Sequence, residues 1–256
     1  MVKSLLGLLE PEEFVGKLGH RLTSATVDEA RRSLGIVFRG LGGAPGLSIV
    51  PVGAGASGHR QQSRDLAVAL LVDASRSTDS WVGPGRVIDI ARESALIFSH
   101  ALDAGGDPHA VFAFTSKGRN DVRVEIVKDF SEAFSPAITK RLGALRPGHY
   151  TRIGAALRHT TAQLDRQPAH DRLLLVRTDG KPNDADHYEG RFGIEDTRRA
   201  IQEARRDGVR VFGITIDVRA QALFPILFGR GGFAIVSDPA RLPAAMPLLL
   251  KHLMAG

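Results

Sequence analysis

Residues 70–77 read Leu-Leu-Val-Asp-Ala-Ser-Arg-Ser, and the fold prediction starts from this stretch. The apolar run 66–72 predicts a buried strand that stops at the carboxylate of Asp73. The hydroxyls of Ser75 and Ser77 follow on a loop, and open α/β sheets place their binding sites on loops beyond strand ends. One carboxylate and two hydroxyls are hard oxygen ligands, which suit Mg²⁺ or Mn²⁺. On this stretch alone, a serine-rich turn after a strand explains the pattern equally well.

Strand patterns alternate with helix patterns from this point to the end of the chain. Strands are predicted at residues 66–72, 111–114, 122–127, 173–176, 209–216 and 233–236. Helices are predicted at residues 87–102, 134–145, 152–165, 195–207 and 239–254. The run 122–127 alternates in polarity, as expected of an edge strand with one exposed face. The prediction is an α/β fold: a doubly wound, Rossmann-like, mostly parallel sheet with helices on both faces.

The first 63 residues differ in character from the rest. Residues 1–50 predict a small helical arm, because Pro11 opens one amphipathic pattern and Thr26 opens a second. The second helix would present Ala30, Leu34, Val37 and Phe38 on its apolar side, and residues 47–50 could form one short strand. Residues 51–63 read as a flexible linker, so the main domain is predicted at 64–256.

The chain carries a formal net charge of +6. Its arginine pairs at 198–199 and 205–206 lie next to acidic residues, which indicates charged helix faces rather than a binding patch. No aromatic residues interleave with a basic cluster, so nucleic-acid binding is not the prediction.

Composition also bears on the compartment. The sequence contains no cysteine, which fits a reducing compartment and rules out a thiolate metal site. The apolar run at residues 5–9 is too short for a signal-peptide core, and no later run is long enough to span a bilayer. The expected location is the cytoplasm.

Catalytic signatures are missing from the sequence. A phospho-aspartate enzyme usually carries a second carboxylate two residues after its nucleophile, where this chain has Ser75. The sequence has neither a Gly-x-x-x-x-Gly-Lys-Ser/Thr loop for ATP nor a Gly-x-Ser-x-Gly elbow. The histidines show no spacing typical of zinc ligands. The chain is therefore predicted not to be an enzyme.

The Asp-x-Ser-x-Ser pattern resembles the metal-ion-dependent adhesion site (MIDAS) of von Willebrand factor A domains. The resemblance implies a fourth ligand from a Thr on a later loop and a fifth from an Asp that closes another strand. Thr151 follows the segment 146–150, and Asp179 follows the apolar run 173–176. The implied ligand set is Asp73, Ser75, Ser77, Thr151 and Asp179.

Longer blocks resemble one branch of these proteins, the NorD/CbbO group. They are the segments 72–81, 146–156 and, above all, Thr-Asp-Gly-Lys-Pro-Asn-Asp at 178–184, which continues to residue 198. Residues 9–16 and 41–43 are similar to the N-terminus of that group. The group usually has a long helical region before the A domain, where this chain has the short linker.

That resemblance implies a function and partners. Members act with a MoxR-type AAA+ ATPase (NorQ or CbbQ) as remodelling chaperones of nitric oxide reductase or Rubisco. The expected function is therefore a non-enzymatic adaptor whose Mg²⁺ site captures an acidic residue of a client or partner, assisting activation of a metalloenzyme such as nitric oxide reductase. A CbbO-like Rubisco adaptor, a Mg²⁺-dependent hydrolase and an RNA-binding A domain are the alternatives.

The loop 181–191 follows Asp179 directly and is predicted to rim the metal face. Its candidate partner-binding residues are Lys181, Asp184, His187, Tyr188 and Arg191. For Tyr188 and Arg191 the alternative is that they pin this loop to the next helix.

Overall fold

The computed structural model describes residues 36–38, 65–83, 85–179, 181–242, 245–246, 249–250 and 253. The predicted linker and, apart from 36–38, the predicted N-terminal arm lie outside the described residues.

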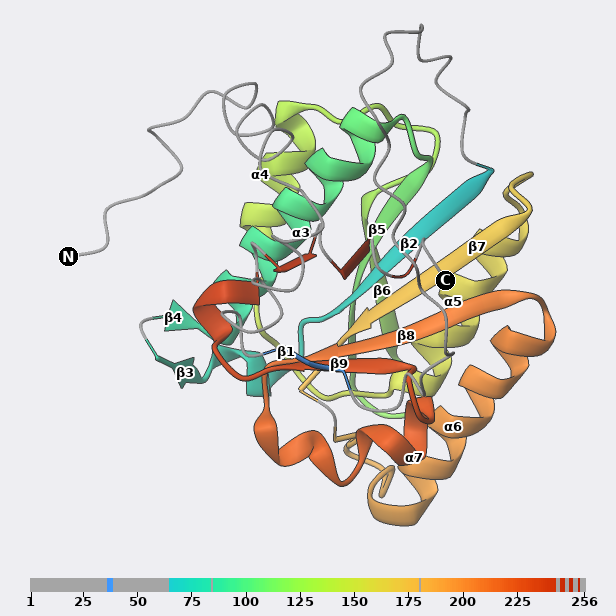
Figure 1. Ribbon diagram of the computed structural model, residues 1–256. Coiled ribbons are helices and arrows are strands. Elements are labelled where there is room, and N and C mark those ends of the chain that lie inside the picture. The colour runs from blue at the N-terminus through green and yellow to red at the C-terminus, as the bar shows by residue number, and fades with distance from the viewer. Residues whose placement is uncertain are drawn as a thin grey trace, which may run out of the picture.

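A seven-stranded sheet forms the centre of the domain, in the order β1-β9-β8-β7-β2-β5-β6 (Figure 1). The five strands from β9 to β5 run parallel to one another, and the two edge strands are antiparallel to their neighbours. Their bounds are β1 Ile36–Phe38, β2 Leu66–Asp73, β5 His109–Ser116, β6 Val122–Lys128, β7 Asp171–Arg177, β8 Val209–Thr215 and β9 Phe233–Val236. The predicted mostly parallel α/β sheet is confirmed.

Helices cover both faces of this sheet. On one face lie α3 Val87–Gly105, α4 Pro136–Ala144 and the C-terminal segment, which is helical at 242, 245–246, 249–250 and 253. On the other lie α5 Ile153–Asp165, α6 Gly190–Arg206 and α7 Phe224–Phe228. Alternate residues of β2 face the two layers, which explains why its sequence is apolar without interruption.

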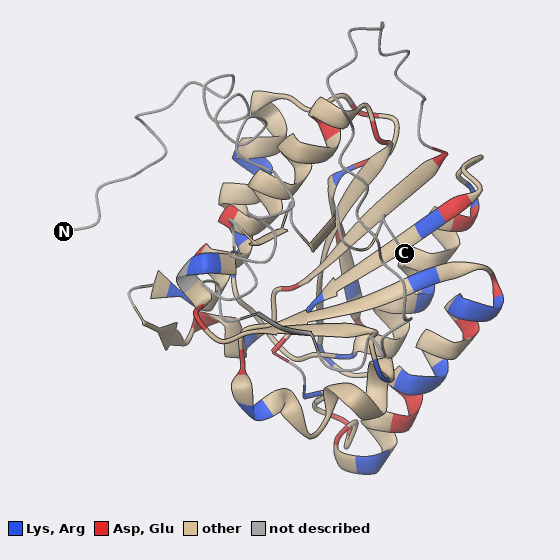
Figure 2. Ribbon diagram, viewed as in Figure 1, with Lys and Arg blue, Asp and Glu red and all other residues tan. Residues whose placement is uncertain are grey.

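Charged residues lie on the outer surfaces of the helices. Figure 2 shows Lys and Arg interspersed with Asp and Glu along α6, as the sequence predicted for its arginine pairs. Arg198 pairs with Glu195 at 2.7 Å, and Arg199 pairs with Glu203 at 3.2 Å. Among the described residues, no helix combines the length and the hydropathy needed to cross a bilayer.

One predicted element is wrong in type. Residues 36–38 were expected near the end of an amphipathic helix, but they form strand β1, which pairs with β9 from Ile36↔Val236 to Phe38↔Ala234. Without this strand, β9 would be a sheet edge with unpaired backbone groups, and the Ile-Val pair suits a strand. A tertiary requirement therefore overrides the local helix pattern.

Smaller differences lie at the loops. Helix α6 begins at Gly190, five residues before the predicted start, so Arg191 lies in its first turn rather than on a loop. Three short elements were not predicted from the sequence: the hairpin of β3 Trp81–Val82 and β4 Gly85–Arg86, the 3₁₀ turn Val218–Gln221, and α7. Helix α3 ends as predicted, because Gly106 adopts a left-handed conformation with φ 71°.

Candidate metal centre

Asp73 ends β2, the strand that lies between β5 and β7 in the middle of the sheet. Its carboxylate is fully buried. The backbone N–H of Ser75 donates to Oδ1 at 2.9 Å, and the hydroxyl of Thr178 donates to Oδ2 at 2.7 Å. Both oxygens are therefore engaged by the chain, and Asp73 joins the end of β2 to the residue that follows β7.

Ser75 and Ser77 lie on the turn that follows. The turn continues into a 3₁₀ helix, Arg76–Asp79, whose Thr78 hydroxyl donates to the Ser75 carbonyl at 2.6 Å. This turn brings the Ser75 and Ser77 hydroxyl oxygens to 2.9 Å from each other. Ser75 is buried and Ser77 is exposed, so the hydroxyl pair extends from the interior to the surface.

Thr151 is brought to the same edge of the sheet by backbone pairing. Its N–H donates to the carbonyl of Asn183 at 2.7 Å, and the Asn183 N–H donates back at 3.1 Å. Two residues before Thr151, the backbone carbonyl of His149 accepts a hydrogen bond from the Arg76 N–H at 3.1 Å. The loop before α5 is thus fixed between the serine turn and the segment that follows Asp179.

The charge of Asp179 acts on the buried carboxylate of Asp73. Burial, first, and the charge of Asp179, second, raise the pKa of Asp73 to about 6, against hydrogen bonds that lower it. A buried carboxylate beside a second carboxylate is relieved by a cation. The donor types present, two carboxylates and three hydroxyls, fit a hard divalent ion such as Mg²⁺ or Mn²⁺. Among the described residues, no three His, Asp or Glu side chains gather into a metal-holding group, so hydroxyls must complete the set.

Arg177 is a charged neighbour of this centre that the sequence reasoning missed. It ends β7, is almost fully buried, and donates from Nη2 to the Val87 carbonyl at the start of α3 at 3.1 Å. Its Nε and Nη1 have no hydrogen-bond partner among the described residues. Burial lowers its pKa, while the charges of Asp73 and Asp179 oppose that shift, so Arg177 is a buried cation within electrostatic range of the two carboxylates. Its position directly before Thr178 was the available signal.

Two of the five predicted rim residues are buried, which corrects their assignment. Tyr188 is only 1% exposed, and its hydroxyl donates to Asp196 Oδ2 on α6. Asp184 accepts hydrogen bonds from the N–H groups of Gly118 at 2.6 Å and Ala185 at 2.7 Å, and from Arg152 Nε at 3.0 Å. Neither side chain is available to a partner. The alternative for Tyr188, that it pins the loop to the next helix, is the one the structure supports.

Arg152 is the residue that binds these buried groups together, and the sequence reasoning did not single it out. It pairs with Asp184 and with Asp186, and its guanidinium lies over the Tyr188 ring. The remaining predicted rim residues, Lys181, His187 and Arg191, are exposed. His187 and His149 both adopt left-handed backbone conformations, with φ 61° and 53°.

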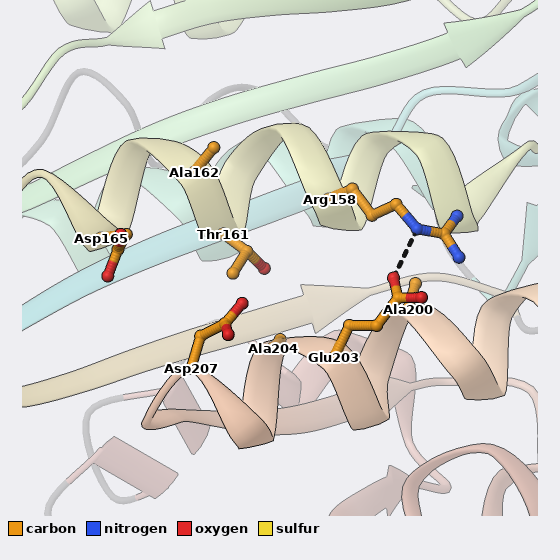
Figure 3. A pocket seen from close by; sticks show the side chains of 8 residues that line it. All are labelled: Arg158, Thr161, Ala162, Asp165, Ala200, Glu203, Ala204 and Asp207. Carbon is orange, nitrogen blue, oxygen red and sulfur yellow. Dashed lines mark hydrogen bonds and ion pairs between the residues drawn. The ribbon is translucent and has the colours of Figure 1, made fainter.

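A hollow of about 210 Å³ lies between α5 and α6 (Figure 3). None of its lining residues belongs to the loops that carry the five predicted ligands, which are called the metal loops below. The hollow extends to Asp165 and Asp207 near the C-terminal ends of the two helices, and the Arg158–Glu203 ion pair of 2.6 Å crosses it. Half of its lining residues are charged and its apolar side chains are alanines, unlike the apolar clefts that hold drug-sized ligands.

Comparison with known proteins agrees with this geometry. The family model described as von Willebrand factor type A domain matches residues 67–223. Protein NorD of Brucella abortus is 54% identical over 194 residues, covering 76% of this chain and 31% of the relative. Protein NorD of Stutzerimonas stutzeri is 46% identical over 182 residues, covering 71% and 30%. The chain thus spans about a third of the length of the curated relatives it matches.

A solved structure shares the fold at lower identity. The von Willebrand factor type A protein of Catenulispora acidiphila superposes with a TM-score of 0.56 at 22% identity, covering 73% of this chain and 42% of that one. The strand order, the loop that follows β2 and the matched residues 67–223 lead to one conclusion: this chain belongs to the von Willebrand factor type A domain family.

Proposed function

We propose that this chain is a non-enzymatic adaptor that uses a divalent metal site to bind an acidic residue of another protein. The observation that carries the proposal is the 2.9 Å contact between the Ser75 and Ser77 hydroxyls beside the buried carboxylate of Asp73. Ser75, Ser77 and Thr151 would hold Mg²⁺ or Mn²⁺ through hydroxyls, with Asp73 and Asp179 supplying negative charge. When bound, the cation offers a coordination position to a carboxylate oxygen from outside.

The chain's own residues set the character of this site. Both oxygens of Asp73 already accept hydrogen bonds from Ser75 and Thr178, which favours a role behind the hydroxyls, orienting the turn and neutralising charge. The exposed side of the centre then consists of Ser77 and the half-buried Asp179. A site with few direct carboxylates leaves the cation underneutralised, so that it attracts an acidic ligand.

We further propose that the partner is a MoxR-type AAA+ ATPase of the NorQ/CbbQ kind and that the client is a metalloenzyme such as nitric oxide reductase. The identity of 54% to a protein named NorD supports this choice over a CbbO-like role in Rubisco activation. The sequence has no phosphate-binding Gly-x-x-x-x-Gly-Lys-Ser/Thr loop, so ATP hydrolysis is assigned to the partner. A cytoplasmic location follows from this partnership and belongs to the same proposal.

Thermal unfolding with and without millimolar Mg²⁺ or Mn²⁺ tests the metal site. A ligand that binds only the folded state at 100 times its dissociation constant adds about 2.7 kcal/mol, which for a domain of this size raises the midpoint by roughly 5 °C or more. Ser77→Ala is the decisive variant, because this side chain is exposed and its loss leaves the core intact. Ser80→Ala is the matched control, because it removes an exposed hydroxyl that donates to the Ser77 carbonyl at 2.7 Å and so perturbs the same turn without removing a proposed ligand.

The expected result is a metal-dependent rise in wild type and Ser80→Ala that is lost in Ser77→Ala and in Asp73→Ala. An equal rise in Ser77→Ala would place the ion elsewhere and overturn the site. The adaptor role is then tested by retention of the purified ATPase and client on the immobilised chain. Equal retention by wild type and Asp179→Ala would show that the metal site does not make the contact.

A further inference from the structure

The loops at the carboxyl edge of the sheet present basic side chains on both sides of the metal centre. Lys117 and Arg119 lie on the loop after β5, Arg76 on the loop after β2, and Lys181 on the loop after β7. All four side chains are exposed. These residues are referred to below as the basic row.

The order of the strands places the loops that carry these residues next to one another. Strands β5, β2 and β7 are consecutive neighbours in the sheet. Asp73 ends β2, and Asp179 lies two residues beyond the end of β7. Neighbouring strands lie about 4.8 Å apart, so the three strand ends span roughly 10 Å, about the length of three extended residues. Arg219, after β8, lies on the loop one strand further along.

Backbone hydrogen bonds fix these loops to one another. Ser116, the residue before Lys117, exchanges two backbone hydrogen bonds with Tyr150, at 3.0 and 2.9 Å. The N–H of Arg119 donates to Asp186 Oδ2 at 2.8 Å, which ties the loop after β5 to the loop after β7. The row is therefore carried by a connected rim.

Three acidic residues on these loops are neutralised by arginines of the same chain. Asp79 pairs with Arg86 at 3.0 Å, Asp121 with Arg123 at 2.8 Å, and Asp217 with Arg219 at 3.0 Å. Asp186 and the buried Asp184 share the single positive charge of Arg152, which leaves one negative charge on that group. Asp179, a proposed metal ligand, and the exposed Glu189 at the N-cap of α6 have no ion pair among the described residues.

The cations of the basic row lack such partners. Within the part of the chain that the structure describes, Arg76, Lys117, Arg119 and Lys181 form no ion pair with a carboxylate. Lys181 acts at longer range on Asp217, whose pKa its charge helps to lower. The edge of the sheet that carries the metal loops therefore has an excess of positive charge, although the helix faces are balanced.

We infer that the basic row binds an extended acidic segment of the partner, in which further carboxylates flank the one that reaches the metal. This inference rests on the proposed function and deepens it, because it makes the recognised feature a run of acidic residues rather than a single one. The flanking carboxylates pair with Arg76 on one strand end and with Lys117 and Lys181 on the neighbouring ones. Trp81, 71% exposed, and Tyr150, 41% exposed, provide apolar contacts beside the row.

A strand of bases fits this edge less well than a peptide does. Sequence-tolerant binding of single-stranded nucleic acid uses several aromatic faces in succession along the phosphate track. Among the described residues, the exposed Phe, Tyr and Trp side chains are Trp81, Tyr150 and Phe192. They lie on three separate elements, the β3–β4 hairpin, the segment before α5 and the first turn of α6, and not in succession along the row.

The experiment uses fluorescence anisotropy with three labelled octapeptides with blocked ends, in millimolar Mg²⁺. One peptide carries a single central Glu, one carries four Glu, and one carries Gln in their place. The variant is Lys117→Glu/Lys181→Glu. Its matched control is Arg166→Glu/Arg206→Glu, which changes two exposed cations at the C-terminal ends of α5 and α6, the ends that are far from the metal loops. The metal-dependent thermal shift verifies that each variant keeps an intact metal site.

The four-Glu peptide is expected to bind wild type and the control about tenfold more tightly than the one-Glu peptide, from two or more exposed ion pairs. In Lys117→Glu/Lys181→Glu this ratio is expected to fall to about one. An unchanged ratio in that variant would overturn the basic row. A single-stranded oligonucleotide of equal charge that displaces the four-Glu peptide at lower concentration would overturn the acidic segment as its occupant.

Two further titrations of the one-Glu peptide, one without Mg²⁺ and one with Ser77→Ala, separate this inference from the proposed function. Binding of the one-Glu peptide that needs neither Mg²⁺ nor Ser77 would overturn the metal-dependent capture of a carboxylate. The ratio between the two acidic peptides tests the row alone, because both peptides bring the same central Glu.

Discussion

The guanidinium carbon of Arg152 lies 4.1 Å from the centroid of the Tyr188 ring. This contact joins the residue after Thr151 to the segment just before α6, across 36 residues of sequence. The same guanidinium donates to Asp184 at 3.0 Å, and the Tyr188 hydroxyl is held by Asp196. Arg152 thus connects the loop that carries Thr151 to the segment that follows Asp179, without belonging to the proposed ligand set.

Replacing Arg152 by Lys is expected to weaken both the fold and the metal site. Lysine keeps the charge but loses the planar fork that pairs with Asp184 and Asp186 while lying on an aromatic ring. The free energy of unfolding is expected to fall by about 1–3 kcal/mol, because buried acceptors lose charged hydrogen bonds. Urea unfolding measures this change, with the exposed Arg166→Lys as control. A full metal-dependent thermal shift in Arg152→Lys would contradict the positioning role.

Gly154 is expected to be intolerant of even a methyl group. A Cβ at this position in α5 would collide with Asp196 Oδ2 and lie 2.8 Å from Asp196 Cγ and 3.0 Å from the Tyr188 hydroxyl. Gly143, in α4, has no atom within 4 Å of its added Cβ. Gly154→Ala should therefore destabilise the domain by roughly 1–3 kcal/mol, whereas Gly143→Ala should stabilise it by roughly 0.5–1 kcal/mol. Equal urea midpoints for the two variants would contradict the close packing of α5 on α6.

Arg177 is expected to restrain metal affinity. Its buried charge lies within electrostatic range of Asp73 and Asp179, so it competes with a divalent cation for the same field. Removing the charge with Arg177→Leu should tighten Mg²⁺ binding by more than about tenfold, because a unit charge and a divalent cation about 10 Å apart repel by about 3 kcal/mol at an effective dielectric constant near 20. Arg177→Lys keeps a cation and should remain close to wild type. Titration of the thermal midpoint with Mg²⁺ distinguishes the two, and equal affinities in all three proteins would refute the competition.

His109 gives the domain a pH dependence that is separate from the metal centre. It begins β5, and burial, with the charge of Lys128 second, lowers its pKa to about 4, against the opposing Asp107 carbonyl and Asp103. The unfolded chain takes up a proton near pH 6.5, while the folded chain does so only near pH 4. This contribution to stability is therefore complete above pH 6.5 and is lost as the pH falls through that window.

The slope from this histidine can reach about 1.4 kcal/mol per pH unit. Urea midpoints of wild type and His109→Leu, measured at pH 7.5 and at pH 5, give the comparison. Wild type should lose more stability between the two pH values than the variant does. Parallel losses would mean that His109 is protonated equally in both states.

The sequence was sufficient for the sheet and its main helices because their signals are strong and local. The uninterrupted apolar run of β2 and the alternation in β6 each report how many faces are buried, and both strands are where the sequence predicted them. The contact between the Ser75 and Ser77 hydroxyls likewise follows from a short turn. Thr151 lies just before α5 and Asp179 just beyond β7, which is the helix and strand context that the sequence pattern indicated.

The remaining features depend on contacts that sequence periodicity does not report. Strand β1 satisfies the backbone hydrogen-bonding groups at the open edge of β9. The helical pattern in residues 26–38 contains no information about that edge, so it did not predict the strand. Asp184 and Tyr188 are polar residues in a loop, which predicts that they are exposed. Both are buried, because they contact Arg152, which is 36 positions before Tyr188 in the sequence. The excess of positive charge at one edge appears only when the pairing of each carboxylate is known.

The hydrogen bond from Thr178 to Asp73 joins residues that are 105 positions apart, and β2 lies at the middle of the sheet with β7 beside it. On the ribosome, β5 emerges soon after β2, but the strand on its other side is synthesised only much later. The Asp73 carboxylate therefore lacks this donor until β7 and Thr178 have been synthesised, and such long-range pairing is slow. The hydrogen bond can form only once the whole segment from β2 to β7 is available to fold.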